Sequence, residues 1–126
     1  MGIFVDKELF EIKINFIESK LNSITTSIKI LSEDSPTFVL CKCKGRDFEN
    51  MSKTLEDSTI LNSINGNPML RINIFYKSII KNFVKELYLH DGDNVSKINL
   101  STESINSLHY NIVKAIAKKW MNITGG

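Results

Sequence analysis

Apolar and polar residues alternate along the N-terminal part of the chain. Between residues 9 and 18, Phe10, Ile12, Ile14 and Phe16 stand at every second position, which is typical of a strand with one buried and one wet face. A helix is the competing interpretation, because Phe10 and Ile14 also lie at helical spacing. The intervening Glu, Lys and Asn residues favour the strand.

Two further strands are expected before Gly45. Residues 24–31 are rich in β-branched side chains, and residues 37–44 continue the apolar pattern. The Ser-Glu-Asp-Ser-Pro segment between them, residues 32–36, has the composition of a turn between paired strands. We therefore predict that the three strands pair in chain order as an antiparallel meander.

The middle of the chain is more polar and carries mixed signals. Phe48, Met51 and Leu55 recur at helical spacing, so a short amphipathic helix is expected to lie across the sheet. The Asn-Gly-Asn-Pro sequence at residues 65–68 predicts a turn. Residues 70–76 then alternate again, which predicts a fourth strand.

Residues 79–89 fit a helix as well as a strand, and the turn that follows them favours a hairpin. The Asp-Gly-Asp-Asn sequence at residues 91–94 is typical of hairpin turns, because Gly adopts the positive φ that these turns require. Residues 95–100 supply the returning strand.

The C-terminal part predicts the longest helix, over residues 102–122. Ser101 is suited to cap its first turn, and Glu103 is suited to the positive end of its dipole. Apolar side chains at helical spacing line the face that we expect to cover the sheet: Ile105, Leu108, Ile112, Ile116 and Trp120. The expected fold class is α+β, a single domain over residues 1–126 with an antiparallel sheet of five or six strands packed against a long C-terminal helix.

Composition and charge narrow the choice of protein class without deciding it. Hydrophobic residues make up 42% and charged residues 24% of the 126 residues, which is the usual balance of a folded domain. The 16 Lys and Arg against 14 Asp and Glu give a net charge of +2, far from that of a basic nucleic-acid-binding arm. No apolar run is long enough to span a membrane, and residues 1–7 lack the order of a secretion signal, so a cytoplasmic location is expected.

The residues that carry chemistry do not form a recognisable active site. Cys41 and Cys43 would supply half of a zinc site, but a closed site needs four ligands, and the two histidines, His90 and His109, lie far along the chain. His109 borders the apolar face of the last helix and is expected to pack there. The sequence contains no nucleophile elbow, phosphate loop or metalloprotease motif. We expect a protein that is not an enzyme and that binds no metal or cofactor.

Basic residues interleaved with aromatic ones point to a binding face. Lys42 and Lys44 share a strand face with Phe38, and Arg71 and Lys77 lie on or beside the polar side of the predicted fourth strand. Such a face neutralises phosphates and stacks unpaired bases, although an ordinary solvated sheet face with a partly covered aromatic has the same pattern. The candidate partner-binding residues are Lys42, Lys44, Arg71, Phe75, Tyr76 and Lys77.

The predicted hairpin, the Lys-Ile-Asn-Leu-Ser run at residues 97–101 and the long helix after it resemble the end of the PC4-like and Whirly single-stranded-DNA-binding domains. This resemblance implies several antiparallel strands followed by a helix, with single-stranded nucleic acid as the partner. No family binding motif accompanies it, and residues 46–68 are an extra element, so the resemblance assigns no site residues.

The composition is also similar to that of bacterial immunity proteins, small α+β proteins rich in Ile, Asn, Lys and Ser that neutralise a partner toxin. This similarity implies occlusion by a stable scaffold, with one face of complementary charge around apolar anchors. Phe75, Tyr76, Tyr88 or Tyr110 would supply those anchors. The leading hypothesis is a non-catalytic protein-binding module, in its sharpest form an immunity protein that inhibits a toxin by occlusion. The alternative is a single-stranded nucleic-acid-binding protein.

Overall fold

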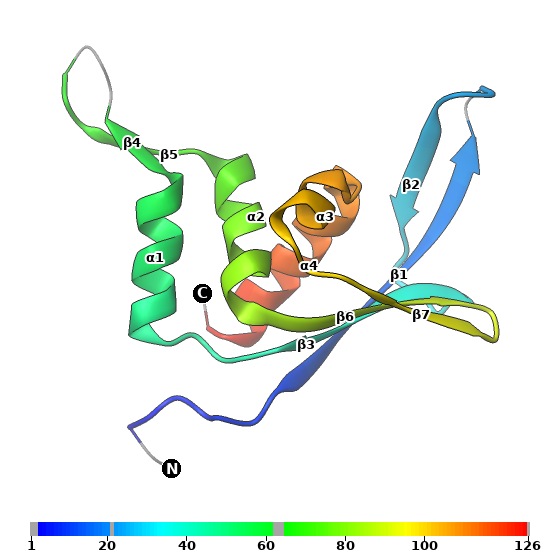
Figure 1. Ribbon diagram of the computed structural model, residues 1–126, viewed down its shortest axis with the longest axis horizontal. Helices are drawn as coiled ribbons and strands as arrows, with labels where there is room; N and C mark the ends of the chain where they lie inside the picture. Colours follow the sequence, from blue (N-terminus) through cyan, green and yellow to red (C-terminus); the bar gives the residue numbers. More distant parts are fainter. Residues whose placement is uncertain (1–2, 21, 62–64, 126) are drawn as a thin grey trace.

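A five-stranded antiparallel sheet packs against a group of helices (Figure 1). The computed structural model describes residues 3–20, 22–61 and 65–125. The strands of the sheet follow the order β2-β1-β3-β6-β7. Their bounds are β1 Phe10–Lys20, β2 Thr26–Ile30, β3 Thr37–Cys43, β6 Val84–Asp91 and β7 Asn94–Ile98. The expected α+β class is confirmed.

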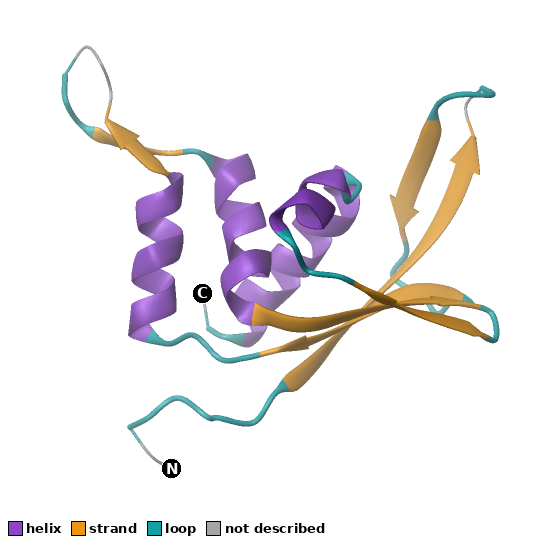
Figure 2. Ribbon diagram, viewed as in Figure 1, coloured by secondary structure: helices purple, strands orange, loops and turns teal. Residues whose placement is uncertain are grey.

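The helices gather on one side of this sheet (Figure 2). They are α1 Phe48–Ser58, α2 Ile72–Phe83, α3 Thr102–Ser107 and α4 Tyr110–Ile123. A separate two-stranded ribbon, β4 Thr59–Leu61 paired with β5 Pro68–Leu70, lies between α1 and α2 in the chain. None of the helices in the described ranges is long and apolar enough to cross a membrane.

β1 pairs with different strands along its two halves. Its second half pairs with β2, with Phe16 opposite Ile30, and residues 10–15 pair with β3. The three predicted strands are confirmed, but the predicted meander is wrong, because β3 lies beside β1 and not beside β2. Residues 31–36 form a corner instead of a hairpin turn, and there the Ser35 hydroxyl donates to the Phe16 carbonyl at 3.1 Å. The corner carries the chain from one edge of β1 to the other.

α2 occupies the place of the strand predicted at residues 70–76. Its buried apolar side chains follow helical spacing and continue to the end of the helix: Phe75, Tyr76, Ile79, Ile80 and Phe83. Because α2 is packed against both α1 and α4, it is apolar on more than one face. A helix of that kind reproduces a short stretch of period two, which is why the strand prediction is wrong.

Residues 79–89 contain a helix and a strand in succession, since α2 ends at Phe83 and β6 begins at Val84. The hairpin that follows is confirmed. Asp91 lies opposite Asn94 across the β6–β7 ladder, and Gly92 in the turn between them has a φ of +61°. Gly adopts this conformation without the steric cost that a Cβ atom would add.

The core lies between the sheet and the helices. Alternate strand residues point into it: Ile12, Ile14, Phe16, Val39, Cys41, Cys43 and Leu87. From the helical side, the Trp120 ring packs against the Phe83 ring at 4.2 Å between centroids. The Trp120 indole N–H donates to the Lys44 carbonyl at 3.0 Å, so the one polar group of the buried indole ring has a hydrogen-bond partner. α4 is thereby fixed to the end of β3.

The C-terminal helix is broken where a single helix was predicted. α3 ends at Ser107 and α4 begins at Tyr110, with extended backbone at His109 between them. The His109 Nδ1 accepts the Asn111 N–H at 3.2 Å, so this histidine is an exposed N-cap and the predicted packing role is wrong. The apolar face is confirmed, because its members are buried or half-buried: Ile105, Leu108, Ile112, Ile116 and Trp120.

α1 is the predicted middle helix, but it packs on α2 and not across the sheet. Its Phe48 and Leu55 side chains are exposed and its Met51 side chain is half-buried against the core, so only part of the predicted apolar face packs inward. The buried positions are the polar Thr54 and Ser58. Asn82 of α2 donates to the Thr54 hydroxyl at 2.8 Å, and this buried hydrogen bond sets how the two helices meet.

Candidate binding face of the sheet

The strands present a second set of side chains on the sheet face opposite the helices. Residues directly opposed in an antiparallel ladder share a face, and successive residues alternate between faces. Because Ile12, Val39 and Leu87 are buried in the core, their sequence neighbours point away from the helices. We call this surface the open face; it comprises Glu11, Lys13, Asn15, Phe38, Leu40, Lys42, Glu86, Tyr88, His90, Val95 and Lys97.

Two stacked rings lie on the open face. Phe38 of β3 is directly opposite His90 of β6, and their rings are parallel to within 11° with centroids 4.4 Å apart. The Lys13 ammonium lies 4.3 Å from the centre of the Phe38 ring and also forms an ion pair with Asp34 at 3.5 Å. Both rings are half-buried, so neighbouring side chains hold their positions and part of their surface is left to solvent.

A compact charge cluster lies beside the rings, centred on Glu86. The Tyr88 hydroxyl donates to the Glu86 carboxylate at 2.8 Å, and the ammonium groups of Lys42 and Lys97 lie 3.8 and 3.6 Å from it. The hydrogen bond from Tyr88, with help from the two lysines, lowers the pKa of Glu86 below its ordinary value. The same hydrogen bond raises the pKa of Tyr88. The hydrogen bond and the two nearby ammonium groups therefore favour the ionised form of the Glu86 carboxyl group.

The structure separates the six residues chosen from the sequence. Lys42 lies on the open face, where it pairs with Glu86. Lys44 follows β3 and forms an ion pair with Asp47 at 3.6 Å. The other four belong to α2 or the residue that caps it, since the strand expected there is a helix: Arg71, Phe75, Tyr76 and Lys77.

Burial decides what those four α2 residues can contact. Phe75 and Tyr76 are only 7% and 6% exposed, so neither offers a ring to a partner. Arg71 is exposed at the start of α2, and Lys77 lines a pocket on the helical side of the molecule. Of the six candidates, the open face retains Lys42.

His90 lies on the open face, although the sequence drew attention to it only as a histidine far from the two cysteines. Its position opposite Phe38 depends on the register between β3 and β6, which no local pattern specifies. The alternation of Leu87 and Leu89 with Glu86, Tyr88 and His90 was the available signal, because it places the three polar-tipped side chains on one strand face.

The two cysteines lie on the core side of β3 and make poor ligands. Burial raises the pKa of Cys43 to about 12 and raises that of Cys41 even further above its ordinary value. A thiol kept protonated in this way is a weak nucleophile and a weak metal ligand. Within the part of the chain that the structure describes, no three His, Cys, Asp or Glu side chains gather to hold a metal ion.

The open face thus presents a pair of stacked rings, the half-buried side chains of Leu40 and Tyr88, and charged groups of both signs around them. No protein-family model matches the sequence, and neither curated proteins nor solved structures yield a significant match to the chain.

Proposed function

We propose that the protein is a non-catalytic binding module that holds a partner protein against its open face, and that in its sharpest form it is an immunity protein that occludes a toxin. The observation that carries this proposal is the stack of Phe38 on His90 on a sheet face that none of the described helices covers. Aromatic side chains held in fixed positions lose little entropy on binding and are frequent anchors of protein interfaces.

The charges around this stack favour a protein partner. Glu86 stands between Lys42 and Lys97, so positive and negative groups alternate across the face within a few side chains. A polar rim of both signs around an apolar centre is the usual composition of a protein interface. It also gives orientation to the partner, because mismatched like charges are costly.

A single-stranded nucleic acid is the second candidate partner, and one observation favours it. The Lys13 ammonium lies over the Phe38 ring, so a positive charge stands directly beside the stacked rings of Phe38 and His90. Bases stack on aromatic rings while nearby lysines neutralise the phosphates. The Glu86 carboxylate in the same face would repel the phosphates, which places this candidate second.

The two partners are distinguished by comparing Phe38→Ala with a matched control, Phe48→Ala. Phe48 is an exposed aromatic on α1, away from the open face, so its loss removes a ring of the same size. If a protein binds the open face, Phe38→Ala weakens a stoichiometric complex captured from the native host at least about tenfold, and Phe48→Ala leaves it intact.

For a nucleic-acid partner, the same variants are titrated with a single-stranded oligonucleotide at increasing salt. Binding that is lost with Phe38→Ala and falls as salt rises would replace the protein proposal with the second candidate. Complexes that survive Phe38→Ala as well as they survive Phe48→Ala would contradict both.

A further inference from the structure

A basic groove, which we call the α4 groove, lies between α4 and the edge of the sheet at β1 and β2. It consists of two adjoining pockets of about 440 and 290 Å³ that share Ile30, Ala115 and Lys118. The strands and the corner after β2 contribute residues 13–15 and 30–32. One face of α4 supplies the opposite wall, with residues spaced as neighbours on a helix surface: Asn111, Lys114, Ala115, Lys118, Lys119 and Asn122.

α4 brings positive charge to this groove without an acidic neighbour. The helix contains three lysines, Lys114, Lys118 and Lys119, and no Asp or Glu. None of the three forms an ion pair with a residue that the structure describes, and no described acidic residue lines either pocket. Asp34, which follows the groove closely in the sequence, is paired with Lys13 at 3.5 Å. The groove therefore favours an anionic ligand.

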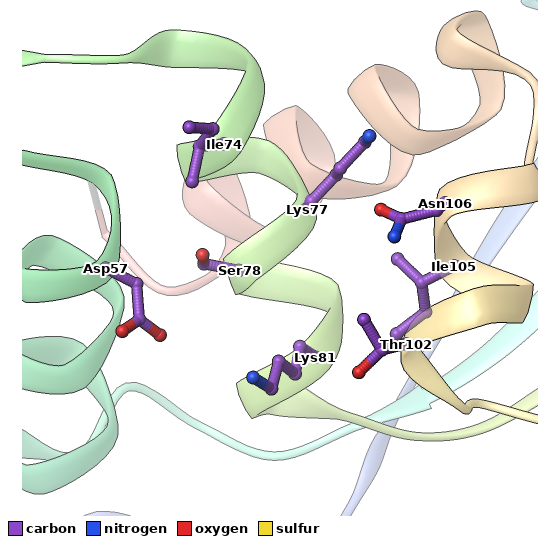
Figure 3. Close-up of a pocket in the computed structure, with 8 residues that line it drawn as sticks. All are labelled: Asp57, Ile74, Lys77, Ser78, Lys81, Thr102, Ile105 and Asn106. Atoms are coloured by element: carbon purple, nitrogen blue, oxygen red, sulfur yellow. The ribbon is translucent and has the colours of Figure 1, made fainter.

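Another pocket, of about 420 Å³ between α1, α2 and α3, lacks this concentration of charge (Figure 3). There the Lys77 and Lys81 side chains extend to opposite sides of α2, and Asp57 lines the α1 wall. The lysines of the α4 groove, in contrast, come from one helix face, and the described residues around them include no acid. An anionic ligand is thus favoured at α4 and not at α2.

The sheet edge at the α4 groove is only partly paired. β1 pairs with β3 along its first half, but on the other edge β2 pairs from Phe16 onward, and the Leu31 N–H donates to the Asn15 carbonyl at 2.8 Å. The Lys13 backbone groups point to the same edge as those of Asn15, because the direction alternates along a strand. There the Lys13 carbonyl accepts a hydrogen bond from the Lys119 ammonium at 3.1 Å. The Lys13 N–H thus faces the groove as a donor, on an edge that no described strand covers at this position.

These features together favour an extended peptide with acidic side chains. An edge N–H pairs with a backbone carbonyl of an added strand. Lys114 and Lys118 are about 6 Å apart along the helix axis, and side chains on one face of an extended peptide repeat at about 6.8 Å, so carboxylates at alternate positions match the two ammonium groups. Ile30 and Ala115 add apolar surface for the aliphatic parts of the peptide. The described lining residues include no aromatic ring on which a nucleic-acid base would stack.

We propose that the α4 groove binds an extended acidic peptide segment of a partner protein, with its carboxylates beside Lys114 and Lys118 and a backbone carbonyl on the Lys13 N–H. This surface is separate from the open face, because the Lys13 side chain lies over Phe38 whereas the proposed contact uses the Lys13 backbone. The inference therefore stands or falls separately from the proposed function, and its test changes no open-face side chain.

The test is an NMR titration of the ¹⁵N-labelled full chain with the peptide acetyl-Glu-Val-Glu-Val-Glu-amide. We expect saturable shifts of the Lys13, Ala115 and Lys118 amides, with a dissociation constant of about 1 mM or tighter. The same peptide with Gln in place of Glu tests the charge and is expected to bind at least about tenfold more weakly. Hexathymidylate tests a chain of phosphates and is expected to leave these amides unshifted.

The backbone contact is measured separately, by hydrogen exchange of the Lys13 amide. At a saturating concentration of the acidic peptide we expect this exchange to slow at least about fivefold, because a carbonyl of the peptide accepts the amide hydrogen. The Gly92 amide, which donates to the Pro36 carbonyl at the β6–β7 turn, is the control and is expected to keep its exchange rate.

The variant Lys114→Gln with Lys118→Gln is expected to weaken peptide binding at least about tenfold. The matched control, Lys53→Gln with Lys81→Gln, removes two exposed lysines from α1 and α2 and is expected to change the affinity less than about twofold. The proposal is overturned if the acidic peptide gives no saturable shifts, if the Gln peptide or hexathymidylate binds equally well, if Lys13 exchange is unchanged at saturation, or if both double variants weaken binding to the same extent.

Discussion

The rings of Phe38 and His90 stack at 4.4 Å although one comes from β3 and the other from β6. The antiparallel register places the two residues directly opposite each other, and their side chains lie on the face without helices. Stacked rings gain on the order of 1 kcal/mol beyond their buried area. The proposed partner-binding function rests on this stack.

The stack predicts an energetic coupling between its two rings. Phe38→Ala and His90→Ala are each expected to lower the free energy of unfolding, and the double variant is expected to lose about 0.5–1.5 kcal/mol less than the sum of the two. Chemical denaturation of the four proteins in this cycle measures the coupling. Losses that simply add would show that the rings do not stabilise each other.

Ile116 on α4 tests whether this helix seals the core. The side chain is completely buried, so Ile116→Ala is expected to lower the free energy of unfolding by about 2–5 kcal/mol. Leu55→Ala on α1 is the comparison, because Leu55 is 43% exposed and its truncation is expected to cost less than about 1 kcal/mol. A loss below about 1 kcal/mol at Ile116 would contradict the placement of α4.

The hydrogen bond between Asn82 and Thr54 predicts a large effect from a small change. Thr54→Val keeps the shape of the side chain but leaves the buried Asn82 amide without its acceptor, at an expected cost of about 1–3 kcal/mol in unfolding free energy. Thr54→Ser keeps the hydroxyl, so it separates loss of the hydrogen bond from loss of the methyl group. A Thr54→Val protein that is as stable as the unmodified chain would contradict a role for this hydrogen bond.

Tyr88→Phe is expected to raise the pKa of Glu86 toward its ordinary value, because the hydroxyl that donates to the carboxylate is removed. The pKa is read from the Glu86 side-chain carboxyl signal in a ¹³C NMR titration, with Tyr110→Phe as a control on α4. Since the pKa of Glu86 is lower in the folded protein than in the unfolded chain, the stabilisation from this carboxylate is complete above the pKa that Glu86 has in the unfolded chain. It is lost as the pH falls through the folded pKa. An unchanged titration in Tyr88→Phe would contradict the hydrogen bond.

Cys43 is expected to resist thiol reagents in the folded protein. With its pKa raised to about 12 by burial, the thiol stays protonated at pH 8, and the reagent also has no access to it. Labelling followed by mass spectrometry should therefore be slow in buffer and fast in denaturant. Rapid labelling in buffer would show that this part of β3 opens readily.

Period-two alternation predicted β1, because that strand buries one face only, whereas β-branched composition predicted β2 and the Asp-Gly-Asp-Asn turn predicted the β6–β7 hairpin. Alternation failed at residues 70–76, where α2 is buried on several sides and its apolar residues are too dense to reveal one period. The site was harder to predict than the strands. Phe38 and Lys42 could be placed on one strand face from local alternation, but their meeting with His90 depends on a pairing between distant segments.

The role of the open face is tested most directly by photo-crosslinking in the native host. Val95→p-benzoylphenylalanine places the crosslinker on the open face, where Val95 is 57% exposed, and Ser52→p-benzoylphenylalanine places it on the exposed side of α1. We predict one dominant protein adduct at position 95 that disappears when Phe38→Ala is added, with no matching adduct at position 52. An equally strong adduct at both positions, or a position-95 adduct that nuclease treatment returns to the mass of the protein alone, would contradict binding of a protein at the open face.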